Sequence, residues 1–289
     1  MIVDSIEIRE LRDLAEIKQA CAVQQEVWGT SDLDVVPFHE FIAARDAGGT
    51  LIGAFLNNPE GVHLIGFVYG FVGCEWGQFT IHSHLAAVKP EFRNLQIGYR
   101  LKLAQREVAL SRGITLITWT FDPLQSLNAH FNFARLGVVA DIYKVNYYGD
   151  ETSILLPGLG TDRFWVKWEL ESPRVRQRLK STHRSSEPEA LPDLVTLIRV
   201  DKDDSPKILA RPSQLPLSDN PFLVEIPEQI GDLQAHRPEL AAAWREATRS
   251  AFTEALAAGY KVVEFFRRKN GERRTGAYLL TASSRRNLS

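Results

Sequence analysis

The chain has 289 residues, 44% of them hydrophobic and 24% charged, which is typical of a globular protein with one large or two modest domains. Its net charge of −2 gives no basic excess, so we expect neither nucleic acid nor an anionic membrane surface as a partner. No apolar run approaches the length of a membrane span, and the first residues lack the pattern of a secretion signal.

The chain contains two cysteines, Cys21 and Cys74, and both lie in apolar sequence surroundings. We expect them to be reduced core residues rather than a disulfide. No Cys/His spacing predicts a zinc site, so no metal is expected. These features together predict a cytoplasmic protein.

The first part of the chain alternates between strand and helix patterns. The patterns predict a strand at 5–11, helices at 14–28 and 38–44, and strands at 50–56, 62–74 and 79–88. Glycines inside the 62–74 strand indicate bulges or a close backbone approach. From Ile97 the apolar residues recur at helical spacing, and Gly113 is expected to end this helix in a left-handed conformation.

The later part continues with further strands and helices. We predict strands at 114–121, 138–148 and 162–170, with a short helix at 127–136 that ends at Gly137. Strands at 194–200 and 222–226, a helix at 238–258 and a hairpin at 261–266 and 275–280 around Asn270-Gly271 follow. The last nine residues are expected to fray.

Residues 172–192 carry several arginines and no aliphatic periodicity. A nucleic-acid arm is one interpretation, but we favour a solvated linker because aromatic stacking residues are absent from the run. We therefore predict a first domain at 1–171 and a C-terminal α+β segment at 193–289, packed on the first domain or on a dimer partner. The fold class is α/β with a mixed α+β character, a twisted mixed sheet flanked by helices.

The stretch from Phe79 to Gly113 predicts a strand, a tight turn and the start of a helix. The first amides of a helix have no internal partner, so with the helix dipole they can bind an anion. Gly98 would let a phosphate approach the backbone, and Arg93, Arg100 and Lys102 add positive charge nearby. An ordinary strand-to-helix connection is the alternative interpretation.

The segment Val88-Lys-Pro-Glu-Phe-Arg-Asn-Leu-Gln-Ile-Gly98 resembles motif A of the GNAT acyltransferase superfamily. That motif is Arg or Gln, two residues, Gly, one residue, then Gly or Ala, after a strand that ends in Val-x-Pro. Arg93 and Gly98 match, whereas Gln96 stands at the place of the first glycine. The predicted elements through residue 170 also follow the order of the GNAT fold. The two-part layout resembles a branch of predicted GNAT acetyltransferases of about this length.

The resemblance implies that acetyl-CoA or another acyl-CoA is the cosubstrate, with its pyrophosphate at the Arg93–Gly98 turn. It implies that the strand after the motif diverges and leaves a slot for the pantetheine arm, and that a main-chain N–H near residues 85–88 holds the thioester carbonyl. The implied binding residues are Ala87, Val88, Arg93, Asn94, Leu95, Gln96, Ile97, Gly98, Tyr99, Arg100 and Asn128. Asn128 could also be a helix cap.

An attacking amine must be neutral, so a base near this strand would be useful, because an aliphatic amine has a pKa of about 10. Strand alternation places His82 and His84 on one face, and either could act directly or through water. The alternative is that both are hydrogen-bonded filler residues. Glu75 is a second candidate base, although we favour simple solvation for it.

The leaving thiolate needs a proton. The family often uses a tyrosine on the fourth helix, but Phe133 occupies that position here. Tyr148 is our candidate substitute, with Tyr143 and Tyr147 as alternatives, and each could instead be an aromatic core or rim residue.

The leading hypothesis is therefore an N-acyltransferase that moves an acetyl or other acyl group to a primary amine by direct attack. A non-catalytic CoA- or acyl-CoA-binding regulator is the alternative, motivated by Gln96 and Phe133. A third is an interaction protein whose C-terminal segment recruits a partner. We prefer a small-molecule amine as acceptor, leave the acyl group open between acetyl, succinyl and longer, and consider a homodimer.

Overall fold

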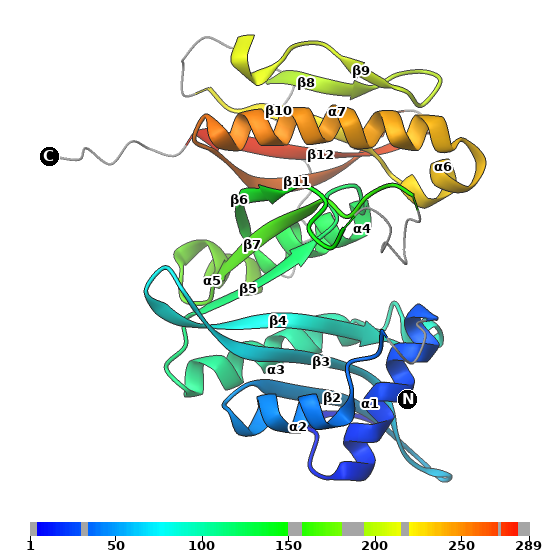
Figure 1. The fold of residues 1–289 in the computed structure, drawn as a ribbon, viewed down its shortest axis with the longest axis vertical. Coiled ribbons are helices and arrows are strands. Elements are labelled where there is room, and N and C mark those ends of the chain that lie inside the picture. The colour runs from blue at the N-terminus through cyan, green and yellow to red at the C-terminus, as the bar shows by residue number, and fades with distance from the viewer. Residues whose placement is uncertain are drawn as a thin grey trace, which may run out of the picture. The chain divides into compact units, whose positions relative to one another are not determined.

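The computed structural model describes residues 5–29, 34–149, 158–180, 194–214, 220–270 and 273–282 (Figure 1). The chain separates into two compact units, residues 1–119 and 120–289. Each unit is described by itself.

The first unit is a sheet with helices on both faces (Figure 1). Strands β1, β2, β3 and β4 pair in sequence as an antiparallel meander, and β5 joins β4 in parallel. The elements are β1 (Ile6–Glu10), α1 (Leu14–Trp28), α2 (Phe38–Asp46), β2 (Thr50–Asn58), β3 (Gly61–Glu75), β4 (Gln78–Val88), a 3₁₀ turn (Pro90–Phe92), α3 (Ile97–Ser111) and β5 (Leu116–Phe121). The last two residues of β5 belong to the second unit.

Two hydrophobic clusters hold this sheet between its helices. Alternate residues of β2 and β3 point to opposite faces, as the period of a strand requires. Leu51, Phe55 and Phe67 pack with residues of α1 and α2, while Ile52 and Val68 pack with residues of α3. The helix ends follow the sequence: Asp13 accepts a hydrogen bond from the Glu16 amide at the start of α1, and Gly113 follows α3 with φ of 74°.

The second unit contains the remaining strands in the order β7-β6-β11-β12-β10-β8-β9. Its elements are α4 (Ser126–Ala129), a π-helix (His130–Leu136), β6 (Val139–Lys144), β7 (Arg163–Glu169), α5 (Pro173–Lys180), β8 (Val195–Val200), β9 (Pro206–Ile208), a 3₁₀ turn (Pro212–Gln214), β10 (Phe222–Pro227), α6 (Ile230–His236), α7 (Pro238–Ala257), β11 (Tyr260–Asn270) and β12 (Arg273–Ala282). The predicted α/β class, a mixed sheet flanked by helices, is confirmed.

Helix α7 buries one apolar face, on which Trp244 and Ala255 are fully inaccessible. Among the described residues of this helix, Arg245 is the one buried cation. It forms an ion pair of 2.6 Å with Asp122 and also donates a hydrogen bond to the Leu159 carbonyl. These contacts join α7 to segments more than 80 residues earlier in the chain. The domain boundary proposed at residue 171 remains a prediction.

The prediction of a solvated linker is wrong for its first residues, because Pro173–Lys180 form helix α5. Val175 is buried, the Arg174 guanidinium donates to the Gly137 carbonyl, and Arg178 forms an ion pair with Glu264. Arg174 and Arg178 are therefore structural partners rather than solvated residues, which charge counting alone could not reveal. The remainder of the predicted linker, from 181 to 192, lies outside the described residues, as do Gly271 of the predicted hairpin turn and residues 283–289.

Three smaller differences lie in the second unit. The strand predicted at 138–148 ends as β6 at Lys144, since Asn146 takes a left-handed φ of 45° and breaks the strand. The helix predicted at 127–136 is one α-turn followed by a π-helix that ends at Gly137, as expected, with φ of 78°. Helix α6 and strand β9 are short and were not predicted. No helix in the described ranges has both the length and the apolar character that a membrane crossing requires.

Candidate functional site

The loop between β4 and α3 has the form that the sequence predicts for an anion site. It turns through two left-handed residues, Asn94 with φ of 72° and Gln96 with φ of 58°, and the Arg93 side chain donates to the Val88 carbonyl over 3.3 Å. Glycine adopts such a conformation without cost, whereas glutamine does not. Gln96 nevertheless adopts a left-handed conformation that glycine would adopt without cost.

The start of α3 has no side-chain cap. The first helical hydrogen bond runs from the Arg100 amide to the Gln96 carbonyl, so the Ile97 and Gly98 amides precede it and lack a helical partner. A Cβ atom added to Gly98 would meet no atom within 4 Å, so open space lies in front of this residue. Donor amides, the positive end of a helix dipole and open space together suit a phosphate group.

The left-handed conformation of Gln96 provides a direct test of this loop. We expect Gln96→Gly to stabilise the protein by about 0.5–1 kcal/mol, because relief of left-handed strain exceeds the extra entropy that glycine loses on folding. Asn94→Gly is the matched control and should give a smaller gain, since asparagine tolerates this region better. Denaturant unfolding measures both, and a loss of stability in Gln96→Gly would show that its side chain holds the loop.

Strands β4 and β5 pair over a short distance only. Their parallel register joins Ile81 to Ile117 and His82 to Thr118, and within the described residues of the first unit it goes no further. Strand β4 continues to Val88, with β3 on its other edge. An edge without a ladder partner presents main-chain donors and acceptors to a ligand. This edge leads directly to the loop before α3.

A β-bulge lies at the start of this edge. Leu85 pairs with Tyr69 and Ser83 pairs with Gly70, so His84 is the extra residue between them. A bulge takes one residue out of the ladder and redirects its backbone. The bulge therefore stands where the β4–β5 ladder ends.

Three side chains form a hydrogen-bonded chain beside the bulge. The Thr118 hydroxyl donates to Glu75 Oε1 over 2.6 Å, and Thr118 Oγ1 lies 3.0 Å from His82 Nδ1. An ionised carboxylate only accepts hydrogen bonds, so Thr118 uses its single hydroxyl proton in the bond to Glu75. Thr118 must therefore accept the hydrogen bond from His82. Neutral His82 therefore carries its proton on Nδ1 and its lone pair on Nε2, the arrangement that a general base needs.

His82 and His84 lie on the same side of the strand. Their ring centres are 6.4 Å apart, and each is within 6 Å of the Phe71 ring. Partial burial, which removes water from the ring, lowers the pKa of His84, and the Glu40 carboxylate opposes this shift. His84 therefore stays largely neutral near pH 7. Glu40 also accepts a hydrogen bond of 3.3 Å from the Tyr69 hydroxyl.

Two basic side chains of α3 do not face the loop as the sequence suggested. Arg100 donates to the Ile6 carbonyl over 2.7 Å, and its second terminal nitrogen is buried without a partner. Lys102 is 4% exposed and donates to Ser83 Oγ over 2.6 Å. Positive charge at the loop thus comes from Arg93 and from the helix dipole.

The remaining candidate residues belong to the second unit. Asn128 is an exposed residue inside α4, whose N-cap is Gln125, so the capping alternative for Asn128 is wrong. Tyr148 lies in the turn after β6, and its hydroxyl is 3.2 Å from Thr120 Oγ1. Tyr143 donates to Asp162 over 2.6 Å, and Phe133 is fully buried against Phe121 and Tyr278.

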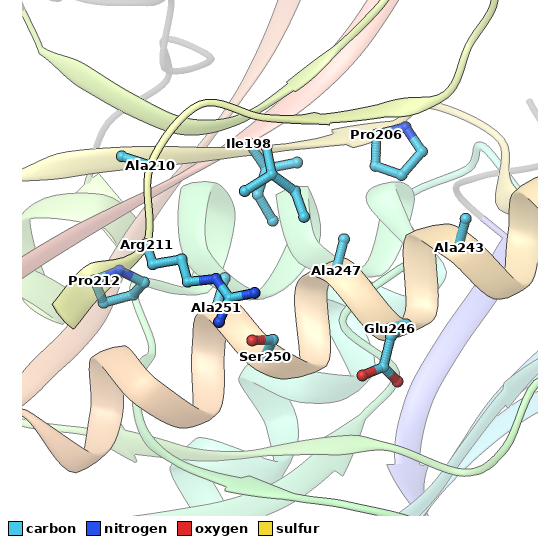
Figure 2. Close-up of a pocket in the computed structure, with 11 residues that line it drawn as sticks. Ile198, Pro206, Ala210, Arg211, Pro212, Ala243, Glu246, Ala247, Ser250 and Ala251 are labelled. Carbon is cyan, nitrogen blue, oxygen red and sulfur yellow. The ribbon is translucent and has the colours of Figure 1, made fainter. Parts of the chain in front are cut away.

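The second unit also contains a cavity of about 330 Å³ between α7 and the β8–β9 segment (Figure 2). Its lining is mostly apolar, since Ala243, Ala247 and Ala251 leave space opposite Ile198. The Ser250 hydroxyl donates to Glu254, one turn along the helix. No acid–base chain like that of His82 appears among the lining residues, so we place the chemistry in the first unit.

Sequence reasoning missed Thr118 and the burial of Lys102. Thr118 follows Ile117 in a strand of strong β-formers, and a polar residue at a buried position there was a usable signal. The burial of Lys102 has no such signal in the sequence, because a lysine in the second turn of a helix is normally solvated. Among the residues that the structure describes, no group of three or more His, Cys, Asp or Glu side chains could hold a metal ion.

Comparison with solved structures finds many N-acetyltransferases. The ribosomal-protein-S18-alanine N-acetyltransferase of Escherichia coli is 13% identical, over 58% of this chain and 95% of its own, with a TM-score of 0.45. A candidate acetyltransferase of the GNAT family from Desulfovibrio desulfuricans is 12% identical, over 57% and 99%, with a TM-score of 0.44. The PaiA N-acetyltransferase of Thermoplasma acidophilum, solved with coenzyme A, is 18% identical, over 57% and 99%, with a TM-score of 0.39.

No family model matches the chain, and no curated protein matches it. A function is therefore proposed from the residues of this chain rather than from these likenesses.

Proposed function

We propose that this protein is a GNAT-type N-acyltransferase that transfers an acyl group from acyl-CoA to a primary amine. The observation that carries the proposal is the uncapped start of α3, with open space at Gly98, at the end of the unpaired β4 edge. A phosphate at the amides and an extended arm along the strand edge are the two features of coenzyme A that such a surface fits.

The binding residues follow from this placement. The main chain from Asn94 to Tyr99 would face the pyrophosphate, with Arg93 as the flanking cation and Arg100 positioning β1 against the helix. Ala87 and Val88 supply the β4 edge for the pantetheine arm. Asn128 and Tyr148 belong to the second unit, and the roles predicted for them, at the pantetheine amide and as proton donor, stay predictions.

The bulge and the histidine chain supply the chemistry. A main-chain amide released near the bulge can donate to the thioester carbonyl, whose oxygen gains negative charge as the amine attacks. His82 Nε2 accepts the proton that the amine loses, while Thr118 and Glu75 hold the opposite side of the ring. His84 is a second candidate base. The amine attacks the thioester directly, and no acyl-enzyme is involved.

The acceptor is proposed to be a small-molecule amine. An amine arrives mainly as an ammonium ion, since its pKa is about 10. The carboxylates of Glu40 and Glu75 flank the two histidines and would attract a cation. We also propose a cytoplasmic location, because Cys21 and Cys74 are both free thiols. The expectation that both are core residues is wrong, since Cys21 is half-buried and Cys74 is exposed. A homodimer remains a prediction.

A thermal-shift series tests this function. We expect CoA, acetyl-CoA or succinyl-CoA to raise the melting temperature, because a ligand that binds the folded state stabilises it by about 2.7 kcal/mol at one hundred times its Kd. Gly98→Val should abolish the shift by filling the open space, without loss of stability, since its side chain begins in free volume. Gly231→Val, also in open space but in α6, is the matched control and should keep the shift.

The outcomes separate the hypotheses. A shift with no product across an amine panel would favour the non-catalytic regulator, whereas product formation would remove that alternative. No shift with any of the three ligands at saturation would contradict the proposal itself.

A further inference from the structure

Lys102 is a buried amine in the first unit that the proposed chemistry does not yet use. It lies in the second turn of α3 and is 4% exposed. Its Nζ atom donates to Ser83 Oγ over 2.6 Å and to Gln105 Oε1 over 3.3 Å, and it lies 4.0 Å from the centre of the Trp119 ring. Gln105 in turn donates to Thr50 Oγ1. These contacts fix the position of the amine.

Among the residues that the structure describes, none that contacts Lys102 brings a charge to it. Its contacts from α3, β4 and β5 are an amide, a hydroxyl and an aromatic face, and the next partner, on β2, is the Thr50 hydroxyl. The ionisable residues of these strands that lie nearest in sequence, His82 and His84, point to the other face. Further along α3, Arg106 pairs with Glu107 at the surface. Burial alone lowers the pKa of the Lys102 ammonium to about 7.

Lys102 also lies where the two strands separate. The β4–β5 ladder ends at His82 and Thr118, and the next residue on each strand, Ser83 and Trp119, contacts the Lys102 amine. The Lys102 Nζ atom therefore lies on the α3 face of the sheet, at the point where β4 loses β5 as its ladder partner. On the proposed function, which this inference presupposes, the sulfur of the pantetheine arm would lie near this end of the β4 edge.

We propose that Lys102 is the proton donor to the leaving thiolate of coenzyme A. When the attacked thioester collapses, the carbon–sulfur bond breaks and its electron pair goes to sulfur. Sulfur then takes a proton from the Lys102 ammonium, which becomes a neutral amine. The proton lost by the acceptor amine resides on His82, and exchange with water restores the proton on Lys102 and removes it from His82.

The acidity of this group suits the task. A thiol has a pKa of about 8.5, so an ordinary lysine, with a pKa of about 10.4, would hold its proton too tightly to give it to the thiolate. The buried Lys102 ammonium is the stronger acid of the two and is still half protonated near pH 7. It also supplies the proton that Phe133, at the family's tyrosine position, lacks the hydroxyl to give.

Titration of the thiol of bound CoA tests the inference without an acceptor. The ultraviolet absorbance of the thiolate is followed against pH in the complex, with desulfo-CoA as blank. The thiol and Lys102 should titrate as a coupled pair, so the thiolate signal of the wild-type protein should rise in two steps, the first one unit or more below the usual thiol pKa of about 8.5. Lys102→Met should leave a single step at about 8.5, and Lys102→Gln, which keeps hydrogen-bonding groups, should do the same. Lys207→Met, on exposed β9, is the control and should keep both steps.

The outcomes distinguish this inference from the function on which it depends. Equal thiol pKa values in wild type and Lys102→Met, with CoA bound to both, would overturn the role of Lys102 and leave the acyltransferase intact. Failure of the wild-type protein to bind CoA would overturn both. In turnover assays, Lys102→Met should lower kcat about 100-fold with the KM for acyl-CoA within 3-fold, whereas Lys207→Met should leave both unchanged. An unchanged kcat in Lys102→Met would overturn the role of Lys102 and leave Tyr148 as the candidate donor.

Discussion

Lys102→Met should stabilise the folded protein by about 4 kcal/mol more at pH 6 than at pH 10, relative to the wild type. Lys102 has a pKa of about 7 in the folded state and about 10.5 in the unfolded chain. Below pH 7 the lysine is charged in both states, so the folded state bears the full cost of a buried ammonium. Between pH 7 and 10.5 only the unfolded chain is protonated, so wild-type stability rises with pH. Methionine has a similar shape and no charge, and its variant should lack this rise.

Denaturant unfolding of both proteins at several pH values measures the effect. The difference between the two curves cancels the other groups that titrate over this range. Lys207→Met, at an exposed position, should run parallel to the wild type. If the stability of Lys102→Met also changed with pH in parallel with the wild type, the Lys102 amine would be hydrated in solution. That result would contradict its burial.

His82→Gln should lower kcat by about 100-fold to 10,000-fold while the affinity for acyl-CoA is kept. Glutamine can still donate to Thr118 but cannot accept a proton near neutral pH, so only the base is lost. A pair of variants tests the chain behind it: Thr118→Ser keeps the hydroxyl and should keep activity, whereas Thr118→Val removes the acceptor that fixes the His82 tautomer.

The ¹⁵N chemical shifts of the His82 ring report the tautomer directly. The proton should reside on Nδ1 in the wild-type protein and in Thr118→Ser, and this preference should be lost in Thr118→Val. Wild-type activity in His82→Gln would show that His82 is not the base and would leave His84 as the candidate. A proton on Nε2 in the wild-type protein would contradict the proposed base.

The sequence predicted the part of the fold that local patterns determine. The strand that ends before Pro90, the helix that begins at Ile97 and the left-handed Gly113 were all placed within one residue, because propensity, period and end signals agree there. The turn itself was also predicted, although only the structure shows that Gln96 accepts the conformation of glycine.

The rest of the fold and of the candidate site depends on contacts between residues far apart in sequence. Helix α5 forms because Arg174 and Arg178 find partners in strands and loops up to 90 residues away, so its composition alone indicated a linker. The chain from Glu75 through Thr118 to His82 joins three strands, and no spacing rule connects them. Lys102 is buried because Ser83, Gln105 and Trp119 surround it, which the amphipathic pattern of α3 does not encode.

Titration of ¹⁵N-labelled protein with CoA tests the central claim most directly, because it reports on the amides that are proposed to meet the diphosphate. Saturating CoA should produce its largest backbone shifts at Ile97 and Gly98, and 3′,5′-ADP without a diphosphate bridge should affect them less. Binding of CoA with these two amides unmoved, or no binding at all, would contradict the account.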